Sequence, residues 1–139
     1  LSWELVLKKR VSTLEAFDGF DVDVVAGYGD ADVQRLLDNP GIIRNRLKVT
    51  SIIHNAGIVQ GLRASDGGFA GWLQSHHPLV LNEWVKLFKK TFKFTGPEVV
   101  NEFLMSTGYL EGAHRKDCPI FQAVLARNPP WIAALNTKL

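Results

Sequence analysis

The chain has 139 residues, of which 46% are hydrophobic and 22% charged, and these values are ordinary for a globular protein with one core. No run approaches the roughly 20 apolar residues that a membrane-spanning helix needs, and no segment has the form of a signal peptide. The single cysteine, Cys118, excludes an internal disulfide and favours a reducing compartment. The net charge of +2 predicts no extended basic surface, so contact with nucleic acid would depend on local clusters of basic residues.

The first third of the chain has apolar residues at helical spacing. This spacing predicts one amphipathic helix over residues 1–16. Either Asp21 or Asp23 can cap a short helix that runs through Val25. Asp30 is the expected cap of the helix that follows.

The rest of the chain continues the helical pattern. After a tight turn at Asn39-Pro40-Gly41, a long helix is expected from Ile42 until Ser65-Asp66-Gly67-Gly68 breaks the pattern. Further helices are expected over residues 69–73, 82–92, 97–107 and 121–126, the last ended by Pro129-Pro130. No segment alternates with period two for long enough to indicate a strand. The sequence therefore predicts a single all-α domain, residues 1–139, of about eight helices.

Residues 36–48 combine two expected helical segments with the turn between them. Gly41 allows close approach of a backbone, and free N–H groups at the start of the next helix can face a phosphate. Arg44, Arg46 and Lys48 add positive charge just after the turn. These features indicate a hairpin that grips DNA without reading its sequence. An ordinary helix corner with a solvated basic face fits the local pattern equally well.

His114 and Cys118 are two residues that can bind zinc, and they lie four positions apart. A structural zinc site normally has four ligands, and His54, His76 and His77 are poor complements because none forms a second short-spaced pair with a cysteine. Taken alone, the pair is better explained as a surface histidine and a buried cysteine.

Four blocks in order carry a resemblance to a known family. They are Leu1-Ser2-Trp3 with Leu7-Lys8-Lys9-Arg10, Gly41-Ile42-Ile43-Arg44-Asn45-Arg46-Leu47-Lys48, Phe92-Lys93-Phe94-Thr95-Gly96-Pro97, and Gly108 followed by His114-x-x-x-Cys118. Together they resemble DNA-3-methyladenine glycosylase I, of the helix-hairpin-helix DNA glycosylase superfamily. The resemblance extends to about Cys118 and implies a helix-hairpin-helix glycosylase-like helical fold.

The resemblance also implies a reaction. Such an enzyme flips the nucleotide out of the duplex and hydrolyses the N-glycosidic bond of 3-methyladenine, with no lyase step. Trp3 matches the tryptophan that stacks on the extruded base, although a core tryptophan is the alternative. Lys48 is better explained as a phosphate contact than as a Schiff-base lysine. Asp66 is left out of the catalytic set because the resembled family does without an aspartate there.

The family's N-terminal segment would precede Leu1, so the resemblance implies that the chain is N-terminally incomplete. That segment supplies the expected catalytic glutamate, and a Cys and a His that complete a structural zinc site with His114 and Cys118. No catalytic residue is therefore named in this chain, which is expected to bind zinc weakly or not at all; an inactive fragment is the alternative that the missing segment leaves open. Departures from the family pattern leave the lesion range open; they are Thr91, Asn101, Met105 and residues 110–113.

The expected partner is double-stranded DNA that contains alkylated adenine, bound by a monomer in the bacterial cytoplasm at the nucleoid, away from membranes. A non-catalytic helix-hairpin-helix DNA-binding module and a helical protein-interaction domain are the alternatives. Trp72, Trp84, Phe88 and Phe92 are expected in the core because of their helical spacing. The lysines at 86, 89 and 90 are most simply a solvated face, although they could extend the DNA contact.

Overall fold

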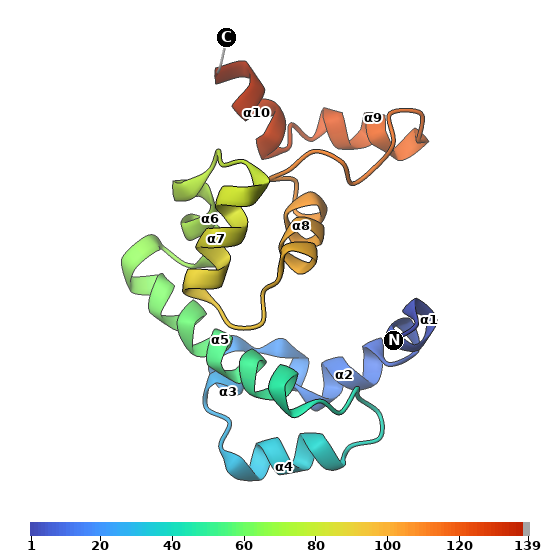
Figure 1. Cartoon of the computed structure of the whole chain (residues 1–139), viewed down its shortest axis with the longest axis vertical. Helices are drawn as coiled ribbons and strands as arrows, with labels where there is room; N and C mark the ends of the chain where they lie inside the picture. Colours follow the sequence, from blue (N-terminus) through green and yellow to red (C-terminus); the bar gives the residue numbers. More distant parts are fainter. Residues whose placement is uncertain (138–139) are drawn as a thin grey trace. The chain divides into compact units, whose positions relative to one another are not determined.

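The computed structural model describes residues 1–137, and the side chains of residues 1–135. Every regular element within residues 1–137 is a helix, which confirms the predicted all-α class. The chain forms two compact units (Figure 1): the first is Leu1–Phe69 with Phe92–Phe94, and the second is Ala70–Thr91 with the chain from Thr95 onward. None of the described helices is both long and apolar enough to cross a bilayer.

The first unit contains α1 (Trp3–Lys8), α2 (Arg10–Ala16), the 3-10 helix η1 (Asp18–Phe20), α3 (Val22–Ala26), α4 (Asp30–Asp38) and α5 (Arg46–Asp66). The predicted single helix over residues 1–16 is therefore two helices. They meet at Lys9, where φ is −91° and ψ is 3°, outside the values of an α-helix. Tertiary contacts of the Lys9 side chain, described below, explain a break that the apolar spacing does not reveal.

Two of the predicted helix caps have different outcomes. Asp21 is the N-cap of α3 and accepts hydrogen bonds from two backbone N–H groups of that helix. The prediction for Asp30 is wrong: Gly29 holds the cap position of α4, and its N–H donates to the Asp32 carboxylate at 3.1 Å. Asp30 is instead the first residue of the helix, where its negative charge interacts favourably with the helix dipole.

Asp23 joins α3 to α5, which lie side by side in Figure 1. Its carboxylate accepts hydrogen bonds from Gln60 at 2.9 Å and from Arg63 at 2.6 Å. These bonds, that of Gln60 first, hold the pKa of Asp23 below its usual value of 3.8. The stabilisation that these bonds give is therefore fully present above the usual pKa of Asp23 and is lost only as the pH falls through the lowered pKa.

The core of the first unit is built by side chains from the end of α2 and the residue after it, from α3, α4 and α5, and from the turn between α4 and α5. The most buried are Phe17, Val25, Leu36, Ile42 and Val49, each no more than 2% exposed. Phe92 of the returning segment Phe92–Phe94 packs edge-on against Phe69 at 5.6 Å between ring centroids. This contact brings a distant part of the sequence into the first unit.

The second unit contains most of α6 (Phe69–His76), followed by α7 (Leu81–Thr91), α8 (Pro97–Ser106), α9 (Pro119–Ala126) and α10 (Pro130–Thr137). Trp72, Trp84 and Phe88 are buried and pack on one another, as the sequence predicts for core residues. Helix α10 was not expected from the sequence. Pro130 is its first residue, a position at which proline's missing N–H and fixed φ favour a helix.

We expect Leu36→Ala to lower the free energy of unfolding by about 2–5 kcal/mol, because Leu36 is fully buried and its removal leaves a cavity. Leu47, which is 60% exposed, provides the matched control, and Leu47→Ala should change the same quantity by about 0.5 kcal/mol at most. Urea denaturation followed by circular dichroism measures both. Equal effects of the two substitutions would contradict the assignment of Leu36 to the core.

Candidate nucleic-acid interface

The turn between α4 and α5 is held against α2 by its backbone carbonyls. The Lys9 ammonium donates to the carbonyl of Pro40 at 3.1 Å and to that of Ile42 at 3.2 Å. The Ser12 hydroxyl donates to the carbonyl of Gly41 between them. Three consecutive carbonyls of the turn therefore have their partners on or beside α2.

Gly41 fits closely into this docking. Its N–H donates to the Asn39 side chain at 2.8 Å, and a Cβ at position 41 would lie 3.1 Å from the Ser12 Cβ and 3.0 Å from the Asn39 Oδ1. A side chain at position 41 would therefore require the Ser12 and Asn39 side chains to shift by a few tenths of an ångström. The close approach that glycine allows here is to Ser12, and a contact between Gly41 and DNA stays a prediction.

Helix α5 begins at Arg46, four residues later than the sequence predicts. Asn45 is its N-cap, and the Asn45 side chain accepts from the Lys48 N–H at 3.1 Å. Ile42 and Ile43 precede the helix because the carbonyls of the turn bond to the side chains of Lys9 and Ser12 instead of helical N–H groups. The first N–H groups of α5 have no partner within the helix and create a favourable place for an anion.

The three basic residues predicted to bind DNA have different surroundings. Arg44 and Arg46 are exposed, and neither forms an ion pair within the described part of the chain. Lys48 is half-buried, and its ammonium lies 5.8 Å from the centre of the Phe94 ring. Only the two arginines therefore form a freely exposed basic surface next to the start of α5.

An open cavity of about 510 Å³ lies beside the turn within the first unit, and we call it the Trp3 cavity. Trp3 forms part of its wall and is 75% exposed, so the alternative of a core tryptophan is wrong. The remaining wall is mostly apolar: Val6, Leu7, Lys9, Arg10, Thr13, Phe17, Phe20, Ile42, Ile43, Lys48, Val49 and Ile52. Three cations and no carboxylate are among these described lining residues.

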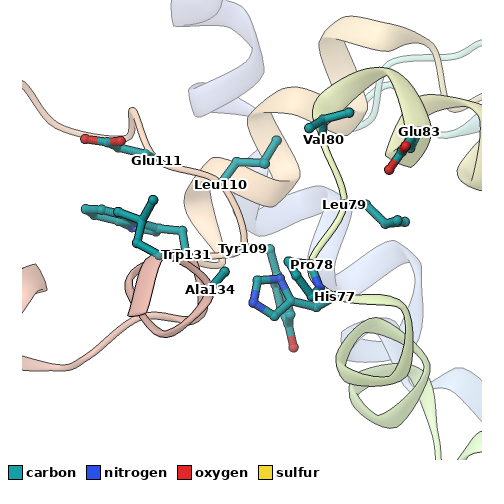
Figure 2. A pocket seen from close by; sticks show the side chains of 11 residues that line it. His77, Pro78, Leu79, Val80, Glu83, Tyr109, Leu110, Glu111, Trp131 and Ala134 are labelled. Carbon is teal, nitrogen blue, oxygen red and sulfur yellow. The ribbon is translucent and has the colours of Figure 1, made fainter. Parts of the chain in front are cut away.

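The second unit holds another cavity, of about 300 Å³, which contains none of the predicted site residues. Figure 2 shows Glu111 and Trp131 on one side of it and Glu83 on the other. His77 bonds to the backbone carbonyl of Pro130 at 2.9 Å, and burial raises the pKa of the neighbouring Tyr109. Two carboxylates and no lysine or arginine line this cavity, so its charge disfavours a nucleic-acid phosphate.

The predicted zinc pair lies in the second unit. His114 lines a cavity of about 210 Å³, and Cys118 is half-buried at the N-cap position of α9. No group of three or more His, Cys, Asp or Glu side chains that could hold a metal occurs in the described chain. His76 and His77 bond to the backbone carbonyls of Trp72 and Pro130, respectively. The donor set present here does not fit a four-ligand zinc site.

The sequence of this chain is similar to those of known methyladenine glycosylases. The sequence profile of the methyladenine glycosylase family matches residues 1–85. A DNA-3-methyladenine glycosylase of Haemophilus influenzae is 31% identical over 86% of this chain and 74% of its own. DNA-3-methyladenine glycosylase 1 of Escherichia coli is 32% identical over 78% of this chain and 68% of its own.

Solved structures agree with the sequence comparisons. A 3-methyladenine DNA glycosylase I of Staphylococcus aureus matches with a TM-score of 0.75 and 30% identity, over 86% of this chain and 73% of its own. A 3-methyladenine DNA glycosylase I in complex with 3-methyladenine matches with a TM-score of 0.74 and 30% identity, over 86% of this chain and 74% of its own.

We expect the 139-residue chain to bind Zn²⁺ far more weakly than the about 10–16 kcal/mol of a complete structural site, because only two ligands are paired here. Competition with a chromophoric chelator measures the affinity. Cys118→Ser is the control, since it should abolish whatever weak binding the thiolate contributes. Stoichiometric zinc that survives the chelator would contradict this expectation.

Proposed function

Because this chain belongs to the methyladenine glycosylase family, we propose that it hydrolyses the N-glycosidic bond of 3-methyladenine in DNA after the damaged nucleotide leaves the duplex. The observation that carries the proposal is a juxtaposition in the first unit. An open apolar cavity with an exposed tryptophan lies next to a turn with two unpaired arginines in the described chain. A base-excision enzyme needs both a pocket for the base and a grip on the backbone.

The chemistry of the lesion suits the exposed tryptophan at this cavity. Methylation at N3 gives the adenine a positive charge and weakens its glycosidic bond, so little acid catalysis is needed. The face of the Trp3 indole attracts a cation, and its exposure in the cavity supports a role in stacking on the extruded base. Water then attacks the oxocarbenium-like sugar, and the enzyme is monofunctional, with no covalent adduct to a lysine.

Binding of the duplex is the second part of the proposal. Arg44 and Arg46, with the N–H groups at the start of α5, would contact phosphates as a helix-hairpin-helix element that reads no sequence. The partner is double-stranded DNA that contains alkylated adenine. We propose that the protein acts as a monomer at the bacterial nucleoid. His114 and Cys118 enter the proposal only as half of a structural zinc site.

We expect Trp3→Ala to reduce release of free 3-methyladenine from methylated DNA by about fivefold or more, since stacking of a base on an aromatic ring contributes about 1–3 kcal/mol. Chromatography of the released base measures the rate. Leu5→Ala is the control, because Leu5 is partly exposed on the same helix but does not line the cavity. Activity that is unchanged by Trp3→Ala would remove Trp3 from the base pocket.

We expect Arg44→Ala and Arg46→Ala each to weaken binding to an undamaged duplex and to reduce the slope of log K against log salt by about 1. Fluorescence anisotropy over a series of salt concentrations measures the slope. Unchanged DNA affinity in both variants would favour a protein-interaction domain. Salt-dependent binding by a wild-type protein that releases no methylated base would favour a non-catalytic DNA-binding module.

A further inference from the structure

Lys48 differs from the other basic residues near the turn, because the fold holds it at the Trp3 cavity. Lys48, Ile52 and Asn55 are spaced four and three residues apart on α5, so they share one face of the helix. Lys48 and Ile52 line the cavity. Asn55 makes a tertiary contact on the same face, with the returning segment Phe92–Phe94.

Asn55 fixes that segment by two hydrogen bonds. Its side-chain N–H donates to the Lys93 carbonyl, and its side-chain oxygen accepts from the Lys93 N–H, each at 2.8 Å. On one side of Lys93, Phe92 is buried against Phe69. On the other side, Phe94 has φ of 58°, a backbone conformation that a residue with a side chain keeps only when its surroundings impose it.

The Phe94 ring then sets the position of Lys48. The ring is 48% exposed, and the Lys48 ammonium lies 5.8 Å from its centre, within the range of a cation–π contact. The two other cations of the cavity wall are placed differently. Lys9 donates to the carbonyls of the turn, whereas Arg10 is exposed to solvent. Lys48 is therefore a cation that the protein holds at the cavity without bonding it to an acceptor in the described chain.

We propose that Lys48 binds a phosphate of the extruded nucleotide, and that Asn55 and Phe94 are positioning residues that hold it in place. The inference rests on the proposed function and names the part of the substrate that this lysine takes. The damaged base is a cation, so the Lys48 ammonium repels the base and attracts the phosphate of the same nucleotide. A phosphate oxygen would accept a charge-assisted hydrogen bond from the Lys48 Nζ.

This role differs from that of the two exposed arginines. Arg44 and Arg46 can contact any duplex, because they lie on the exposed surface beside the start of α5. Lys48 lies at the cavity, so its phosphate contact forms only when a nucleotide has left the duplex. Loss of Lys48 should therefore weaken binding to DNA with an extruded nucleotide and leave binding to an undamaged duplex nearly unchanged.

The test compares two duplexes of one sequence, one undamaged and one with a tetrahydrofuran abasic analogue, by fluorescence anisotropy. We expect Lys48→Met to weaken binding to the analogue duplex by about tenfold and to the undamaged duplex by less than about twofold. Lys48→Arg should keep binding to the analogue duplex near the wild-type level, since it keeps a cation that stacks on the ring. Phe94→Leu should weaken binding to the analogue duplex by about threefold, because it releases the lysine but keeps its charge.

Lys8→Gln is the matched control, because it removes the same charge from an exposed site on α1 that does not line the cavity. Thermal melts of each variant confirm that it is folded. Equal losses on both duplexes with Lys48→Met would overturn the proposal and make Lys48 an ordinary duplex contact. So would an adduct with natural abasic DNA, trapped by borohydride and lost with Lys48→Met, since Lys48 would then be a nucleophile. Binding to the analogue duplex is measured without base release, so it separates this proposal from the proposed function.

Discussion

The docking of one turn on one helix organises the whole first unit. Backbone carbonyls that leave water must find donors, and those of Pro40, Gly41 and Ile42 find them in Lys9 and Ser12. This arrangement brings Ile42 into the core and delays the start of α5. The same residues form one side of the Trp3 cavity, so the cavity and the basic surface beside it depend on the same few hydrogen bonds.

Basic residues that are alike in the sequence have separate roles in the fold. Lys9 stabilises the turn by donating hydrogen bonds to its carbonyls, whereas Arg44 and Arg46 face solvent. Lys48 is held at the cavity by an aromatic ring. A net charge of +2 therefore says little about DNA binding here, because what matters is which cations remain available and where the backbone positions them.

The Trp3 cavity and the cavity of about 300 Å³ in the second unit also differ in charge. Cations and apolar side chains line the Trp3 cavity, whereas two carboxylates, Glu83 and Glu111, line the larger cavity of the second unit. A phosphate is attracted to the first and repelled by the second. This difference supports the proposal of a DNA contact in the first unit, which also holds most of the segment that matches the methyladenine glycosylase family.

The sequence alone determined the all-α class, the buried aromatic residues of α6 and α7, and the identity of the family. These follow from local spacing and from short blocks of residues, which need no knowledge of distant contacts. It missed the break at Lys9, the late start of α5, helix α10 and the partner of Lys48. Only the tertiary structure decided the break at Lys9, the start of α5 and the partner of Lys48. The reason is that the bonds of Lys9 with the turn and of Asn55 with Lys93 join residues more than 30 positions apart.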